Sequence, residues 1–89
     1  MHYVYMIKNS EGLLYVGVSE DLNKRMHYHN TNQGAEFTKN QNSFHLVFSE
    51  GYETLEEARK REVQIKKWRR DKKELLIQRY SERLQTKPE

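Results

Sequence analysis

The stretch that decides the fold is residues 1–29, MHYVYMIKNSEGLLYVGVSEDLNKRMHYH. Residues that favour β-strands crowd the run from Tyr3 to Lys8 and again the run from Leu13 to Val18. Between them, Asn9-Ser10-Glu11-Gly12 has the composition of a turn. The two runs therefore predict a β-hairpin, which is followed by a helix from about Leu22 to His29.

Tyrosines of the hairpin cluster around a glycine if the corresponding faces of its two strands coincide. Because side chains alternate along a strand, Tyr3 and Tyr5 share one side of the first strand, while Tyr15 and Gly17 share one side of the second. Aromatic residues in strands most often serve packing between neighbouring strands. A glycine inside a strand forfeits packing, so Gly17 indicates a bulge or a place where another group approaches the backbone.

The helix after the hairpin carries polar groups on an otherwise apolar stripe. Ser19 or Asp21 can cap its start, where an acidic residue also favours the helix dipole. At the spacing i, i+3, i+4 and i+7, two apolar anchors alternate with two polar side chains, namely Leu22, Arg25, Met26 and His29. One stripe of this helix therefore offers an arginine and a histidine.

The middle of the chain predicts a long loop and a third strand. Residues 30–42 are polar and rich in asparagine and glutamine, which is typical of a loop. A loop of about a dozen residues is long for so small a domain, which favours function or disorder. Lys39 within it could contact phosphate, although a solvated lysine is the commoner role. The alternating phenylalanines and leucine of Ser43 to Gly51 then predict a strand.

Two further helices complete the chain. Thr54 with Glu57 three residues later forms a capping box, which predicts a helix from about Leu55 to Trp68. Asp71 can cap a last helix, from about Lys72 to Leu84. The expected fold class is α+β, with a three-stranded antiparallel sheet flanked by helices in the order β-β-α-β-α-α.

Length and composition restrict the class of protein. With 89 residues, the chain has room for one small domain, expected over residues 1–84, with a frayed tail at residues 85–89. The absence of cysteine excludes disulfides and thiolate metal sites. No signal peptide is visible, and no apolar run approaches the roughly 20 residues that span a bilayer. We therefore expect a cytoplasmic protein that does not associate with a membrane.

Glu62 lies on the helical stripe that should face the core, in register with Leu55, Ala58 and Ile65. Burying an unpaired carboxylate is costly, so this side chain must meet a cation, hydrogen-bond donors or a metal. A salt bridge to an arginine such as Arg25 is the structural interpretation, and an active-site carboxylate is the functional one. The residues alone leave these two interpretations equally open.

Positive charge is concentrated in one segment. Residues 59–73 contain nine of the sixteen lysines and arginines against two acids, a balance of +7 in a chain whose net charge is +3. Such a segment attracts a polyanion, and release of counterions makes the binding dependent on salt. A solvated helix face is the commoner reason for such a composition, so charge alone does not identify the partner.

Five elements, taken together and in order, resemble the GIY-YIG nuclease superfamily in its short, stand-alone bacterial form. The two family tripeptides correspond to Tyr3-Val4-Tyr5 and Tyr15-Val16-Gly17, and the later family residues to Arg25, His29 and Glu62. The chain departs from the pattern at Tyr3, where the family has glycine, and at Val16, where it has isoleucine. The resemblance covers nearly the whole chain and agrees with the predicted order of elements.

The resemblance implies a metal-dependent endonuclease that hydrolyses DNA, with a role in DNA repair or processing. It places Mg²⁺ or Mn²⁺ at Glu62, whose carboxylate suits a hard cation. Tyr5 or Tyr15 would act near the attacking water, one of them as general base or through a relay, which requires cationic neighbours to lower the phenol pKa from about 10. Arg25 would stabilise the phosphate, and His29 would orient a tyrosine or transfer a proton.

The tyrosine face, the Arg25 stripe and Glu62 are expected to meet in one shallow groove beside the basic helix. Further contacts to DNA are expected from residues around the hairpin, the loop and the basic segment, namely Tyr3, Gly17, Lys39, Lys66, Lys67, Arg69 and Arg70.

Two other classes of protein remain open. A non-catalytic nucleic-acid-binding module would keep the groove and the basic helix but show no metal-dependent turnover. A protein-interaction module would use the charged helices to contact a partner and show no salt-sensitive binding to DNA.

Overall fold

The computed structural model describes residues 1–30 and 44–88 of the chain. The elements follow the order β1 (His2–Lys8), β2 (Leu14–Ser19), α1 (Leu22–Asn30), β3 (His45–Tyr52), α2 (Leu55–Lys66) and α3 (Arg70–Ser81). The predicted α+β class and the order β-β-α-β-α-α are confirmed.

The sheet is antiparallel, and β1 lies in its centre between β2 and β3. The hairpin register places Tyr5 opposite Gly17 and Ile7 opposite Tyr15. On its other side, β1 pairs with β3, with an irregularity between Met6 and Ile7. The register therefore puts Tyr5, Tyr15 and Gly17 on one face of the sheet, as the alternation of side chains predicts.

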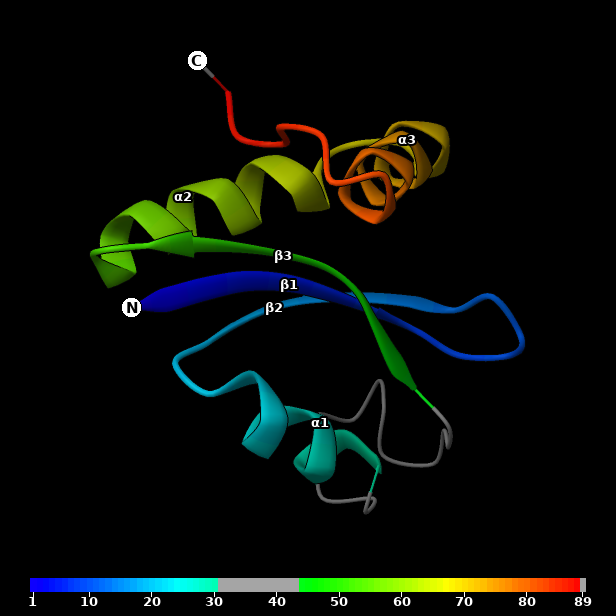
Figure 1. Cartoon of the computed structure of the whole chain (residues 1–89), viewed down its shortest axis with the longest axis horizontal. Coiled ribbons are helices and arrows are strands. Elements are labelled where there is room, and N and C mark those ends of the chain that lie inside the picture. The colour runs from blue at the N-terminus through cyan, green and yellow to red at the C-terminus, as the bar shows by residue number, and fades with distance from the viewer. Residues whose placement is uncertain (31–43, 89) are drawn as a thin grey trace.

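Helices cover both faces of the sheet (Figure 1). The helix α1 lies on one face, and α2 and α3 lie together on the other. The larger core, between the sheet and the α2–α3 pair, is built from Val4, Met6, Val16, Phe48, Ala58, Ile65 and Leu76. The smaller core, beneath α1, contains Tyr5, Ile7 and Phe44, with Leu22 and Met26 packed against it. The tyrosine face is thus the face that α1 covers.

The helix starts agree only in part with the predicted caps. A side-chain oxygen of Asp21 accepts from the Lys24 backbone N–H at 3.0 Å, and the Thr54 hydroxyl accepts from that of Glu57 at 3.2 Å. The predicted cap at Asp71 is wrong, because α3 begins two residues earlier than predicted, at Arg70, and its N-cap residue, Arg69, makes no side-chain cap bond. Asp71 instead pairs with the Arg69 guanidinium at 3.1 Å.

One ion pair is buried beneath α2. The Arg61 guanidinium donates to both carboxylate oxygens of Glu50 on β3, at 2.9 and 3.2 Å, and Tyr52 donates to the same carboxylate at 2.8 Å. Arg61 also donates to the backbone carbonyl of Thr86 at 2.9 Å. The tail segment, for which the sequence predicts fraying, therefore contacts the folded body at Thr86, and Lys87 lies 4.2 Å from the centre of the Tyr52 ring.

Within residues 1–30 and 44–88, no helix is long and apolar enough to cross a membrane.

Candidate active site

The centre of the site is the contact between Tyr5 and Gly17. Tyr5 is 2% exposed, and its hydroxyl lies where a side chain at Gly17 would begin, since a Cβ atom there would be 2.6 Å from that oxygen. The Tyr15 ring is tilted against the Tyr5 ring, with the centroids 6.4 Å apart. The close approach that the glycine predicts is therefore made by a tyrosine of the neighbouring strand.

The electrostatics of Tyr5 connect it to two of the predicted site residues. Burial raises the pKa of the Tyr5 phenol well above its ordinary value, and Tyr15 raises that pKa further. The charge of Arg25 lowers it, and the charge of Glu62 raises it. The predicted lowering of the phenol pKa by cations is not found, because burial outweighs Arg25. The three groups that affect the pKa of Tyr5, a β1 residue, come from β2, α1 and α2.

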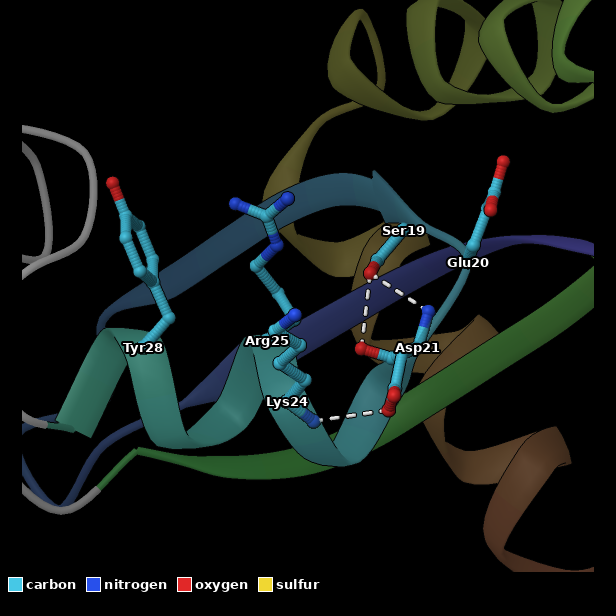
Figure 2. Close-up of a pocket in the computed structure, with 6 residues that line it drawn as sticks. All are labelled: Ser19, Glu20, Asp21, Lys24, Arg25 and Tyr28. Carbon is cyan, nitrogen blue, oxygen red and sulfur yellow. Dashed lines mark hydrogen bonds between the residues drawn. The ribbon is translucent and has the colours of Figure 1, made fainter.

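Arg25 occupies the first turn of α1 and lies at the edge of a cavity of about 610 Å³. The cavity is lined by Ser19, Glu20, Asp21, Lys24, Arg25 and Tyr28. Figure 2 shows Arg25 and Tyr28 extending from α1 to the same side, and the Arg25 guanidinium lies 5.2 Å from the centre of the Tyr28 ring. This cavity includes Arg25 but neither site tyrosine nor Glu62, so it is not the single shared groove that the sequence predicts.

Glu62 lies on α2, which contacts both β1 and the edge strand β2. Its side chain is 8% exposed, yet both of its oxygens have cationic partners. The Arg59 guanidinium lies 3.2 Å from Oε1, and the Lys66 ammonium lies 3.1 Å from Oε2. The predicted burial of this carboxylate is confirmed, and the ion pairs are made with cations of its own helix.

The donor set around Glu62 fits a weakly held, hard divalent cation. The described residues contain no group of three or more histidine, cysteine, aspartate or glutamate side chains that could hold a metal. Mg²⁺ keeps several waters and needs only one or two carboxylates together with a substrate phosphate. Glu62 supplies one carboxylate with two oxygens, and its present partners are half-exposed side chains that can move away. Glu62 alone would therefore hold such an ion weakly, and a further oxygen ligand from the substrate would strengthen the binding.

The comparison with protein families agrees with this geometry. The sequence model of the GIY-YIG catalytic domain matches residues 1–75, which include β1, β2, α1, β3 and α2. The chain belongs to the GIY-YIG nuclease family. The matched region contains Tyr15, Arg25 and Glu62, which all affect the pKa of Tyr5.

Relatives of this GIY-YIG chain cover most of its length. The UPF0213 proteins of Staphylococcus aureus strains Mu3 and Mu50 are each 50% identical over 76 residues, which is 85% of this chain and 93% of the relative. The solution NMR structure of a UPF0213 protein from Bacillus halodurans is similar, with a TM-score of 0.56 and 34% identity. That match covers 86% of this chain and 82% of the other.

The remaining predicted site residues of this GIY-YIG domain lie in different places. Tyr3 lines a separate cavity of about 420 Å³. Arg69 pairs with Asp71, and Arg70 binds Glu74 and the backbone carbonyl of Gly12 at the hairpin turn. Lys66 contacts Glu62, and Lys67 is exposed. Lys39 and the side chain of His29 lie outside the described part of the structure.

Two contacts of the GIY-YIG site were missed by the sequence analysis. Arg59 precedes Glu62 by three residues, and Tyr28 follows Arg25 by three, so both pairs have the spacing of neighbours on a helix surface. That spacing was available in the sequence. Many such pairs are merely solvated, and only the burial of Glu62 and the cavity beside Arg25 distinguish these two.

Proposed function

We propose that this GIY-YIG domain is a divalent-metal-dependent endonuclease that hydrolyses DNA phosphodiester bonds. The observation that carries the proposal is the contact of the buried Tyr5 with Gly17 and Tyr15, in a region that the GIY-YIG catalytic domain matches and that also contains Arg25 and the buried Glu62. An acid–base group, a fixed cation and an oxygen ligand for a metal are the parts that phosphodiester hydrolysis requires.

Glu62 would hold Mg²⁺ or Mn²⁺ together with an oxygen of the scissile phosphate. The ion, when bound, supplies polarisation of the phosphate and stabilisation of the leaving oxygen.

Burial keeps the Tyr5 phenol protonated, so Tyr5 would orient the attacking water, or accept its proton while passing its own proton on toward Tyr15. The contact with Gly17 fixes the Tyr5 hydroxyl in place before the substrate arrives. Gly17 thus contributes by positioning Tyr5. In this scheme, His29 would orient a tyrosine or transfer a proton.

Arg25 would hold the phosphate, because a guanidinium stays charged at all relevant pH values and matches phosphate oxygens in pairs. Its half-buried side chain lies over the Tyr28 ring and lines an open cavity, which gives access from solvent. Lys67, which makes no ion pair within the described residues, would contact the DNA backbone. A role in DNA repair or processing is consistent with this chemistry.

Cleavage of labelled single-stranded, duplex and branched DNA tests the proposal, with Mg²⁺ or Mn²⁺ and with chelator. Wild type is compared with a Glu62→Gln variant whose folding is verified by circular dichroism and thermal unfolding. The expected result is metal-dependent product that Glu62→Gln reduces by about a hundredfold or more. Salt-sensitive DNA binding without product on any substrate would contradict the nuclease and indicate a binding module.

A further inference from the structure

The carboxylate of Glu62 is neutralised by two cations that are themselves in solvent. Arg59 contacts one oxygen and Lys66 the other, and their side chains are 59% and 53% exposed while that of Glu62 is 8% exposed. Both cations come from α2, three residues before and four residues after Glu62. The buried Glu62 carboxylate is therefore fixed in position, whereas the side chains of Arg59 and Lys66 are largely in solvent and can move away from it.

A divalent ion must compete with these two cations for the same oxygen atoms. Ion pairs made by exposed, solvated cations are weak, so a hard divalent cation with a substrate oxygen can displace Arg59 and Lys66. Once displaced, the guanidinium of Arg59 and the ammonium of Lys66 remain within one helical turn of the ion. The phosphate that shares the ion is then the nearest anion available to them.

We propose that Arg59 and Lys66 are exchangeable counterions, which hold Glu62 while the metal is absent and transfer to DNA phosphates when the metal binds. This inference rests on the proposed function, since it takes Glu62 as the metal ligand. It assigns Arg59 a contact with DNA and gives Lys66 a second partner. The exchange keeps Glu62 ionised and aligned for the metal, and it makes binding of metal and of DNA cooperative.

The first test measures Mn²⁺ affinity without DNA, by the electron paramagnetic resonance signal of free Mn²⁺. The variants are Lys66→Met, Arg59→Met and the control Lys60→Met, which removes the same charge from the same helix but from a pair with the exposed Glu56. Loss of a competing cation should tighten Mn²⁺ binding about two- to fivefold in the first two variants beyond any change in the control.

The second test measures DNA affinity as a function of salt, with Ca²⁺ as a divalent ion and with chelator. In the presence of Ca²⁺, Lys66→Met should reduce the slope of log affinity against log salt by about one, because a phosphate contact is lost. With chelator, the same substitution should leave the slope nearly unchanged, since Lys66 is then held by Glu62. Thermal unfolding verifies that each variant is folded.

The outcomes separate this inference from the proposed function. The exchange is overturned if Mn²⁺ affinity is equal in Lys66→Met, Arg59→Met and Lys60→Met. It is also overturned if Lys66→Met changes the salt slope by the same amount with Ca²⁺ and with chelator. Either result counts even where wild type cleaves DNA. Tighter Mn²⁺ binding that Glu62→Gln abolishes, without cleavage of any DNA, supports the exchange and overturns the nuclease. A wild type that binds no Mn²⁺ with or without DNA overturns both.

Discussion

Two carboxylates of this protein are almost equally buried and yet differ in their surroundings. Measured over the whole residue, Glu50 on β3 is 4% exposed and Glu62 on α2 is 6% exposed. Glu50 meets a buried arginine, Arg61, which donates to both of its oxygens and is itself tied to the backbone carbonyl of Thr86. The ion pair of Glu50 and Arg61 is closed to solvent, because both of its side chains are buried.

Glu62 has the same number of cationic contacts per carboxylate, but they come from the half-exposed side chains Arg59 and Lys66. A buried carboxylate is therefore not by itself the sign of a functional site. The exposure of the cationic partner distinguishes a structural carboxylate from an exchangeable one. An exposed partner can be replaced by a ligand, whereas a buried partner cannot leave without a large cost in free energy. By this criterion, Glu50 is structural and Glu62 is available for chemistry.

The largest contrast is expected between Glu50→Gln and Glu62→Gln in urea unfolding. Glu50→Gln leaves the Arg61 charge buried without compensation and should cost about 3–5 kcal/mol of stability. Glu62→Gln leaves only solvated cations and should cost less than about 1 kcal/mol. Equal destabilisation by the two substitutions would contradict the distinction between a closed and an exchangeable network.

A smaller contrast is expected between two glycines that both lie in strands. Gly17→Ala places a Cβ atom 2.6 Å from the Tyr5 hydroxyl, so the ring must move, at a cost of about 1–3 kcal/mol. Gly51→Ala is the matched control, because its Cβ atom would lie 3.2 Å from the flexible Met1 sulfur and from a Tyr3 ring carbon. Gly17→Ala should also reduce cleavage. If the unfolding midpoint of Gly17→Ala is no lower than that of Gly51→Ala, the contact between Tyr5 and Gly17 is not rigid.

Two arginines that lie over aromatic rings also allow an exposed contact to be compared with one that packs on the core. Arg25 lies 5.2 Å from the Tyr28 centroid, and Arg61 lies 5.1 Å from that of Trp68. Tyr28→Leu removes an exposed cation–π contact, so kcat/KM should fall about two- to fivefold through kcat, with stability unchanged. Tyr28→Phe should restore the rate.

Trp68→Leu is the counterpart on the other face of the sheet and should lower stability by at least about 1 kcal/mol, since Trp68 packs on the larger core. A loss of stability in Tyr28→Leu that matches Trp68→Leu would show that Tyr28 has a structural role.

The smallest effect concerns alkaline pH. Burial raises the pKa of Tyr5, and burial with the hydrogen bond to Glu50 raises the pKa of Tyr52. A phenol whose pKa is higher in the folded state contributes stability that is complete below its unfolded pKa, about 10, and is lost as the pH rises above it. Urea midpoints should therefore be flat from pH 7 to 9 and fall above 10. Tyr5→Phe and Tyr52→Phe should each reduce that fall, and an unchanged fall in both would contradict the assignment.

Much of the fold could be predicted because its signals are local. Turn residues at positions 9–12, alternation in the strands and the Thr54 cap each act within a few residues, and each gives the element that the structure contains. The predicted cap at Asp71 is wrong because a short acidic side chain, which can accept from a helix N–H, can equally accept from a neighbouring guanidinium, here that of Arg69.

The candidate site could be predicted only where residue type and spacing are sufficient. The pairing of Tyr5 with Gly17 follows from alternation along a hairpin, and the burial of Glu62 follows from its helical stripe. The burial of Arg61 does not follow, because its partner Glu50 comes from β3 and is distant in sequence. The placement of α1 and α2 on opposite faces of the sheet depends on the path of the chain between elements, which periodicity does not specify.

The contact between Tyr5 and Gly17 has a consequence for how this sequence can vary. The hydroxyl of one residue fills the volume that a side chain of the other would need, so any side chain at position 17 forces the Tyr5 ring to move. A substitution that enlarges position 17 should therefore cost least where position 5 carries a smaller side chain. The tyrosine of the first family tripeptide and the glycine of the second thus act as one steric unit in this chain.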